Sequence, residues 1–263
     1  MLEQLVSGAP VFFLVAIRCF ALISTVPLLS TNAVPRAAKA ALAGYTAFIV
    51  LPSALSAGWN VPPFSLDYAM LVIGEALIGI ITGFYISLIF GAFSTAGQFF
   101  TYQMGFGASE VYDALAQVEN PLMGQFFNLI AMLLFLQVRG FHQLFLGGIF
   151  RSFQSINALT LAAEREQFLN FLLRGLTELF FDAMMIALPI LGTLFLVSIC
   201  TGLLSKAAPQ MNLLSEGLPI TILVAFLLLT WLLPILCNVF INAFDAAFIR
   251  FEDLLSSVTG ARL

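Results

Sequence analysis

Six long apolar runs, separated by polar or turn-forming segments, make up most of this 263-residue chain. None of the runs alternates apolar and polar residues with a period of two, which is typical of helices rather than of membrane-barrel strands. We therefore predict an all-α fold in a single domain, residues 1–263, with about six long and kinked apolar helices. The predicted helices are Val11–Leu29, Ala37–Ala57, Leu66–Ala96, Leu122–Phe150, Phe168–Leu204 and Leu218–Phe248.

Some of these runs are longer than a membrane span requires. Leu66–Ala96 holds about thirty residues, roughly 45 Å as a helix, whereas the hydrocarbon core of a bilayer is near 30 Å. Phe168–Leu204 is longer still. Such helices either tilt steeply and kink, or they are not simple bilayer spans. The candidate kink sites are Gly74, Gly79, Gly83 and Pro189.

The longest polar interruption is the segment Gly97–Pro121, which lies between two apolar runs. It contains the carboxylates Glu110, Asp113 and Glu119 and no lysine or arginine. A loop of this length between membrane helices is usually functional. We predict that this segment, the central loop, is a moving or sealing part. The alternative is an ordered contact with a neighbouring subunit.

Composition indicates an integral membrane protein. Hydrophobic residues make up 61% of the chain and charged residues 9%, and the mean hydropathy is +1.04. This leaves too little polar surface to cover a soluble globule. The first residues include Glu3 instead of a basic start, so we expect the first apolar run to be retained. The positive charges do not identify a cytoplasmic face, as expected for helices that pack on other subunits or for a weakly biased transporter.

Six of the charged residues within or at the ends of the apolar runs are candidates for buried or assembly roles, because a bare charge there costs at least a few kcal/mol. Each is therefore expected to face protein or water and to have a partner. They are Arg18, Glu75, Arg174, Glu178, Asp182 and Asp245.

Glu75 is followed at four-residue spacing by Gly79 and Gly83, which lets another helix approach closely. We predict that Glu75 pairs with Arg18 or bonds to freed backbone groups, and we favour a buried structural pair over a proton relay. Arg174, Glu178 and Asp182 fall four residues apart on one helix face. This triplet is either a polar stripe at a helix end, or an inter-subunit contact or ion path.

Enzyme, metal and nucleic-acid signatures are absent from the sequence. The single histidine, His142, excludes a HExxH site and a histidine cluster. There is no G-x-S-x-G elbow and no P-loop. The three cysteines lie within apolar runs and show no disulfide or metal spacing. A net charge of −4 does not favour a nucleic-acid partner. We therefore expect no enzyme activity and no cofactor.

Several segments, taken in order, resemble the FliR family of flagellar biosynthetic proteins, whose injectisome counterparts are the SctT proteins. Arg18 followed by Pro27 is similar to the family's arginine–proline pattern, and GEALIGIITGF, with Glu75, to its glutamate–glycine helix. The segment Met104–Phe135 is similar to the family's central loop and following helix. Ser152-Phe153 resembles its serine–phenylalanine stretch.

The most specific similarity is Ala208-Pro209-Gln210-Met211-Asn212, which is close to the family's proline–glutamine–x–asparagine signature. Its three signature positions here are Pro209, Gln210 and Asn212. The chain departs from the family at Asp113-Ala114, where Asp-Pro is common, and at Ile156-Asn157, where a proline is usual. The resemblance nevertheless covers nearly the whole chain.

The resemblance implies a part of the export gate of the flagellar type III secretion apparatus. Its partners would be FliP and FliQ, with FlhB and FlhA associated, in the bacterial inner membrane at the flagellar basal body. The gate would pass unfolded flagellar subunits outward. The implied fold joins a FliP-like portion to a FliQ-like one, with helical hairpins raised out of the bilayer plane in a helical assembly. We favour a flagellar over an injectisome system.

The resemblance also implies that the central loop is a plug in the closed pore. Apolar constrictions block ions by excluding water, and methionine and phenylalanine adapt their shape to a moving chain. Glycines provide backbone freedom at the base of the loop. The candidate plug residues are Met104, Gly105, Phe106, Gly107, Glu110, Asp113, Leu115, Pro121, Leu122 and Met123.

The main alternative is an ion-coupled small-molecule transporter in the membrane. It would use intramembrane carboxylates as coupling residues and would show a credible internal repeat. The repeated Leu-Pro-Ile triplets of the C-terminal third carry no weight, because low apolar complexity explains them equally well. The candidate coupling residues are Glu75, Glu178, Asp182 and Asp245.

Overall fold

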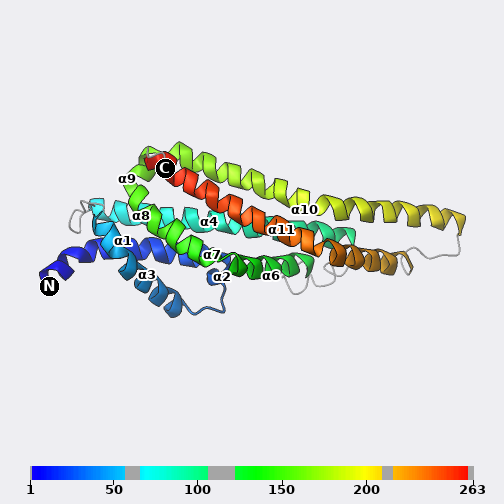
Figure 1. Ribbon diagram of the computed structural model, residues 1–263, viewed down its shortest axis with the longest axis horizontal. Helices are drawn as coiled ribbons and strands as arrows, with labels where there is room; N and C mark the ends of the chain where they lie inside the picture. The colour runs from blue at the N-terminus through cyan, green and yellow to red at the C-terminus, as the bar shows by residue number, and fades with distance from the viewer. Residues whose placement is uncertain (1, 57–65, 106–121, 209–215, 260–263) are drawn as a thin grey trace. The chain divides into compact units, whose positions relative to one another are not determined.

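The computed structural model describes residues 2–56, 66–105, 122–208 and 216–259, and nearly all of these are helical. Five helices of this part of the chain are long and apolar enough to span a membrane, or six if α6 to α8 count as one broken span. The prediction of an all-α membrane protein with about six long apolar helices is confirmed. In chain order the helices are α1 (Leu2–Thr25), α2 (Pro27–Ser30), α3 (Arg36–Ser56), α4 (Leu66–Gln103), α6 (Leu122–Gln137), α7 (Gly140–His142), the π-helix η2 (Gln143–Phe150), α8 (Arg151–Ser155), α9 (Ala158–Ala163), α10 (Arg165–Ala207) and α11 (Leu218–Thr259) (Figure 1).

The chain divides into two compact units. Three helices, α4, α10 and α11, contribute to both units. The expectation of one domain over residues 1–263 stays a prediction. Unit 1 consists of Met1–Ile89, Arg139–Leu176 and Phe244–Leu263, and unit 2 consists of Phe90–Val138 and Thr177–Ala243.

The predicted end of the third helix, Ala96, is wrong, because α4 continues to Gln103. The polar residues that suggested a loop are accommodated inside the helix. The Thr101 hydroxyl donates a hydrogen bond to the Gly97 carbonyl oxygen at 2.9 Å, and the neighbouring Phe100 is fully buried. A threonine that bonds back to its own helix does not end it.

The prediction of one helix over Leu122–Phe150 is also wrong. Helix α6 ends at Gln137, and α7 begins at Gly140. Between them Arg139 adopts φ 56° and ψ 37°, a left-handed conformation through which a right-handed helix does not continue. The apolar pattern runs through this break because residues on both sides are apolar, so hydrophobicity alone does not reveal it.

A short helix, α9, precedes α10, in a part of the chain between two of the predicted apolar helices. Asn157 caps it. The Asn157 side-chain oxygen accepts from the Thr160 N–H at 2.8 Å, and the Thr160 hydroxyl oxygen accepts from the Asn157 N–H at 2.7 Å. This reciprocal capping box satisfies two N–H groups that a helix start leaves free.

The sixth helix also extends past its predicted end. Helix α11 continues from Phe248 to Thr259. Phe251 and Leu255 are buried in unit 1, three and seven residues after Phe248. They extend the same apolar face, while charged residues on the other face obscure the helix in a hydropathy reading.

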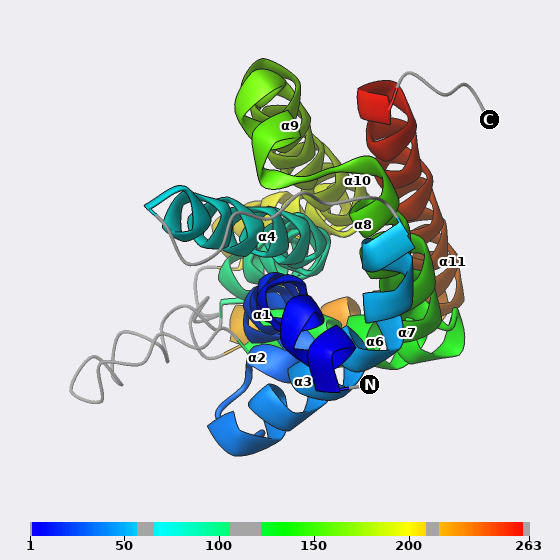
Figure 2. The ribbon, with the colours of Figure 1, turned by 90° about the vertical axis from the view of Figure 1, so that its left-hand side faces the viewer.

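Glycines bring α4 against α1 in unit 1 (Figure 2). A Cβ at Gly79 would collide with the Arg18 carbonyl oxygen, and one at Gly83 would collide with the Thr25 side chain. One turn further on, the Ser87 hydroxyl donates to the Thr25 carbonyl oxygen at 2.9 Å. The close helix approach predicted from the four-residue glycine spacing is confirmed.

Gly79→Ala is expected to lower the melting temperature of the protein in detergent, whereas Gly44→Ala is not. The new Cβ at position 79 would press on a backbone oxygen, which cannot rotate away. Gly44 in α3 has open space around the same position, and there alanine favours the helix by up to about 1 kcal/mol. Thermal unfolding of both variants checks this, and equal melting temperatures would contradict the close packing of α4 on α1.

Candidate functional site

Because α4 continues to Gln103, the central loop is reduced to the part of Gly97–Pro121 that follows this helix, and the structure describes it only where it leaves α4 and where α6 begins. Met104 and Gly105 follow α4, and Leu122 and Met123 begin α6. The other candidate plug residues lie outside the described residues, as do the signature positions. These are Phe106, Gly107, Glu110, Asp113, Leu115 and Pro121 of the loop, and Pro209, Gln210 and Asn212 of the signature.

A glycine cap ends α4 at the base of the central loop. Gly105 has φ 85°, a left-handed conformation that glycine adopts at little cost. Its N–H donates to the Tyr102 carbonyl oxygen at 3.1 Å, and the Met104 N–H donates to the Phe100 carbonyl oxygen at 2.8 Å. Met104 is only 1% exposed. The structure therefore gives this methionine an anchoring position in unit 2.

The other end of the loop is held by direct backbone contact between α6 and α4. A Cβ at Gly97 would lie 2.6 Å from the Gly124 Cα atom, so only glycine fits there. Met123 is buried, whereas the Leu122 side chain is 57% exposed. Both ends of the central loop are thus anchored within unit 2.

Contacts between phenylalanine rings hold α4, α6 and α11 together near these loop ends. The rings of Phe93 and Phe240 are stacked with centroids 3.9 Å apart. Phe127 lies 5.9 Å from Phe240 and 5.2 Å from Phe100. All four side chains are fully buried. Such ring pairs contribute about 0.5–1.5 kcal/mol each beyond the area they bury, so they stabilise the packing of the helices that the loop connects.

Unit 1 contains a buried ion pair between Arg18 of α1 and Glu75 of α4. The Arg18 Nε donates to Glu75 Oε2 at 2.6 Å, and each residue is 1% exposed. The second oxygen, Oε1, accepts from the Ala158 N–H at 3.0 Å, at the start of α9. The pair predicted from the sequence is present, and its carboxylate also binds α9.

The remaining faces of the Arg18 guanidinium contact the corner between α8 and α9. One terminal nitrogen donates to the Ser152 hydroxyl oxygen at 3.1 Å, and the other donates to the Ile156 carbonyl oxygen at 2.8 Å. The guanidinium carbon lies 4.1 Å from the centroid of the Phe153 ring, within cation–π distance. A planar fork of donors with an apolar face suits a buried site of this shape.

Segments from three separate parts of the sequence therefore meet at one buried point. Arg18, Glu75 and Ser152-Phe153 carry three of the motifs on which the family resemblance was based. Ile156 and Ala158 could not be identified as contacts in advance, because they contribute only backbone atoms. We call this group of six residues the Arg18 junction, which consists of Arg18, Glu75, Ser152, Phe153, Ile156 and Ala158.

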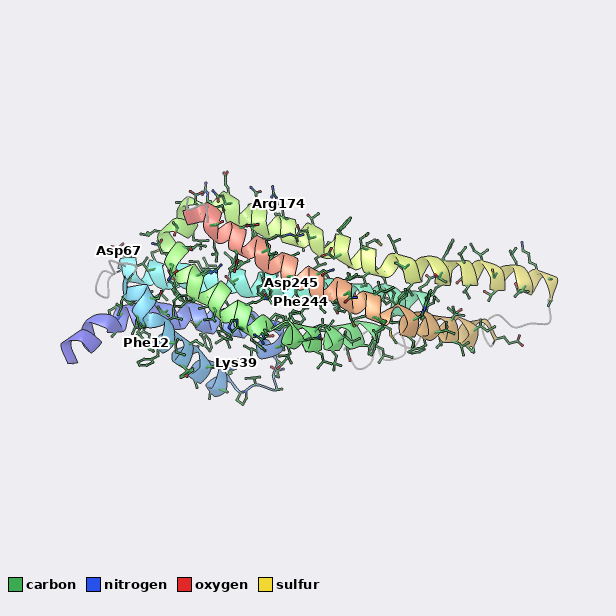
Figure 3. The ribbon with its side chains drawn as sticks, viewed as in Figure 1. Phe12, Lys39, Asp67, Arg174, Phe244 and Asp245 are labelled. Carbon is green, nitrogen blue, oxygen red and sulfur yellow. The ribbon has the colours of Figure 1, made fainter. Side chains whose placement is uncertain are left out.

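The other predicted charges lie on α10 and α11. Arg174 is exposed, and Glu178, Asp182 and Asp245 are half-buried. Arg174 and Asp245, both of unit 1, are labelled in Figure 3. The four-residue spacing along α10 places Arg174, Glu178 and Asp182 on one face of that helix. Their roles in assembly or ion passage stay predictions.

One ion pair of unit 1 was not predicted. The Arg151 guanidinium and Glu252 Oε1 lie 2.8 Å apart, and both side chains are about half exposed. The pair joins α8 to the C-terminal part of α11. Exposed pairs of this kind contribute about 0–1 kcal/mol. Among the described residues, no group of three or more histidine, cysteine, aspartate or glutamate side chains is placed to hold a metal ion.

Comparison with known proteins places similarity along almost the entire chain. The family model described as bacterial export proteins, family 1, matches residues 9–247. The flagellar biosynthetic protein FliR of Bacillus subtilis (strain 168) is 31% identical over 98% of this chain and 99% of its own length. FliR of Escherichia coli (strain K12) is 31% identical over 97% of each chain. FliR of Buchnera aphidicola subsp. Baizongia pistaciae is 30% identical over 85% of each.

Proposed function

The chain belongs to the FliR family, the bacterial export proteins of family 1, and we propose that it forms part of the channel through which unfolded flagellar subunits cross the bacterial inner membrane. As a member of this family it is a membrane component of the flagellar export apparatus. The observation that carries the proposal is the length of the match. Residues 9–247 include the Arg18 junction and both anchored ends of the central loop.

The partners we propose are FliP and FliQ in one hetero-oligomeric gate, with FlhB and FlhA associated. Large apolar side chains are exposed along the unit 2 parts of α10 and α11, and faces of this kind require lipid or another polypeptide. Examples are Phe195 and Leu203 on α10 and Leu227 and Trp231 on α11, each more than half exposed.

Within this gate, the central loop is the plug of the closed pore. A pore wide enough for an unfolded chain would dissipate the proton gradient if it stayed open, so it needs a deformable seal. The glycine contact of α6 on α4 and the cap at Gly105 support this role, because they fix both ends of the loop.

The Arg18 junction gives no support to the alternative of an ion-coupled transporter. A coupling carboxylate has to exchange its ion or proton with water. Both oxygens of Glu75 instead accept hydrogen bonds inside the protein, from Arg18 and from the Ala158 N–H. This arrangement is typical of a structural pair, and we assign no catalytic role to it.

Extraction in mild detergent followed by native mass spectrometry tests the proposal. A tagged chain is expected to be recovered in a complex with FliP and FliQ, and a tagged inner-membrane transporter extracted in parallel is expected to bring neither. Recovery of a stable single chain that binds a small solute would overturn the proposed function.

A further inference from the structure

Three polar side chains lie on one side of α11, a continuous helix that is otherwise mostly apolar up to Phe248. Asn238, Asn242 and Asp245 follow one another at spacings of four and three residues, which places them on the same face of the helix. Both asparagines are exposed, and Asp245 is half-buried. Within the described part of the chain, none of these three side chains makes a hydrogen bond or an ion pair. We call them the α11 polar face.

Other polar groups of α11 are satisfied within the helix. The hydroxyl groups of Thr221 and Thr230 donate to carbonyl oxygens one turn back along the chain, at 3.0 and 2.8 Å, so they need no outside partner. Phe240 lies two residues from each asparagine, roughly on the opposite side of the helix, and it is fully buried in unit 2. The two amides therefore point away from the packed side of α11.

Exposed isoleucines flank the α11 polar face at both ends. Ile235 precedes the first asparagine by three residues, and Ile249 follows the aspartate by four. The spacing of the polar positions thus continues into apolar ones, and the two isoleucines are 58% and 60% exposed. A seam with this spacing and a polar centre is typical of a helix that packs on another helix, where the polar groups fix the register.

Neither lipid nor water suits the whole of this seam. Lipid would cover the isoleucines but would leave two amides and a carboxylate without hydrogen bonds, which is costly in a hydrocarbon environment. Water would solvate the polar groups but would leave large apolar side chains exposed on both sides. A second copy of this chain, docked by the same face, would bring two carboxylates together. A helix of a different chain, with a cation opposite Asp245, satisfies every group.

We propose that the α11 polar face docks a helix of another subunit of the export complex, and that a lysine or arginine of that helix pairs with Asp245. The two asparagines exchange hydrogen bonds with polar side chains of the same helix. This inference rests on the proposed function, because it requires a hetero-oligomeric complex. It adds the surface of this chain that is used and the charge that the partner carries.

Charge reversal at Asp245 tests the pairing. Asp245→Arg is expected to lower the yield of assembled complex on native gels at least about tenfold, because it places two cations together. Asp253→Arg is the matched control, since Asp253 is exposed on the same helix, roughly 80° around it from Asp245. Its yield should stay within about twofold of the wild type. Yields are normalised to the amount of the chain in the membrane, and a wild-type yield for Asp245→Arg would overturn the proposal.

Milder variants keep the test decisive if the reversed charge prevents insertion. Asp245→Asn removes only the charge, and Asn242→Leu removes one amide while the carboxylate stays in place. Each is expected to lower the complex yield about threefold, as expected for the loss of one polar contact between membrane helices. Wild-type yields in both variants would overturn the docking of a helix at this face.

A second charge reversal identifies the cation. In the Asp245→Arg background, each lysine and arginine within the apolar segments of the co-purified subunits is replaced in turn by glutamate. One replacement is expected to restore the yield to within about twofold of the wild type, since the two changes are coupled only if the residues are in contact. A general loss of helix stability would not be restored in this way. Failure of every replacement would overturn the ion pair.

Two other results would assign this face to a different environment. If lipid covers it, Asp245→Leu assembles at or above the wild-type yield, because an apolar side chain favours the membrane. If it lines the aqueous export path, Asp245→Asn changes the export rate per complex and leaves the yield normal. Either result would overturn this inference while the complex persists. Recovery of the wild-type chain alone, without other subunits, would instead overturn the proposed function.

Discussion

Glu75→Ala is expected to reduce the yield of assembled export complex at least about tenfold, while the export rate per assembled complex stays normal. The substitution leaves the Arg18 guanidinium buried at 1% exposure without its carboxylate. Removing one partner of a buried ion pair costs about 3–5 kcal/mol. It also removes the acceptor of the Ala158 N–H, so the start of α9 loses this hydrogen bond to α4.

Glu252→Ala is the matched control for this prediction. It also removes a glutamate from an ion pair of unit 1, but both side chains of that pair are about half exposed. Its cost is about 0–1 kcal/mol, and the complex yield should stay near that of the wild type. Glu75→Gln keeps one acceptor oxygen and is expected to be intermediate. Quantification on native gels measures the yields. Normal yield with lost export would make Glu75 a functional group of the transport path.

The helices could be located from the sequence because apolar runs of membrane-spanning length have few other interpretations. The errors occurred where the backbone and the hydrophobicity change at different places. Arg139 adopts its left-handed conformation within an apolar run, and Thr101 satisfies its hydroxyl within α4. Both depend on hydrogen bonding and packing, which a hydropathy pattern does not report. Asn157 is different, because asparagine is a common helix N-cap residue, so the start of α9 at Ala158 is indicated by the local sequence.

The candidate sites differ in the same way. The Arg18–Glu75 pair could be predicted because a buried charge needs a partner of opposite charge, and the apolar runs of this chain contain few charged residues. The backbone partners of this pair could not be predicted, since the Ile156 carbonyl and the Ala158 N–H are groups that nearly every residue has. For the central loop, the sequence indicated a long polar segment. The anchoring of Met104 and the contact of Gly97 with Gly124 depend on the packing of α4 and α6 in unit 2.

Deleting residues 107–117 is expected to give a complex that assembles at normal yield and conducts ions at least about tenfold better than the wild type in its closed state. The contacts that hold α4 to α6 lie outside the deletion, at Gly97 with Gly124 and at Phe100 with Phe127. Gly105 lies eight residues beyond Gly97, about 12 Å along a helix. The five loop residues that remain span up to about 20 Å, so they can rejoin the two helices.

Replacing residues 107–117 by a glycine–serine linker of equal length distinguishes a seal from a spacer. A linker keeps the chain length but removes the acidic and apolar side chains of the native segment. If the loop seals by excluding water with its side chains, the linker variant leaks like the deletion. If the loop is an ordered contact with a neighbouring subunit, both variants lose assembly before they gain conductance. Normal assembly with wild-type membrane conductance in both variants would rule out the plug, because an open pore of this width cannot retain an ion gradient.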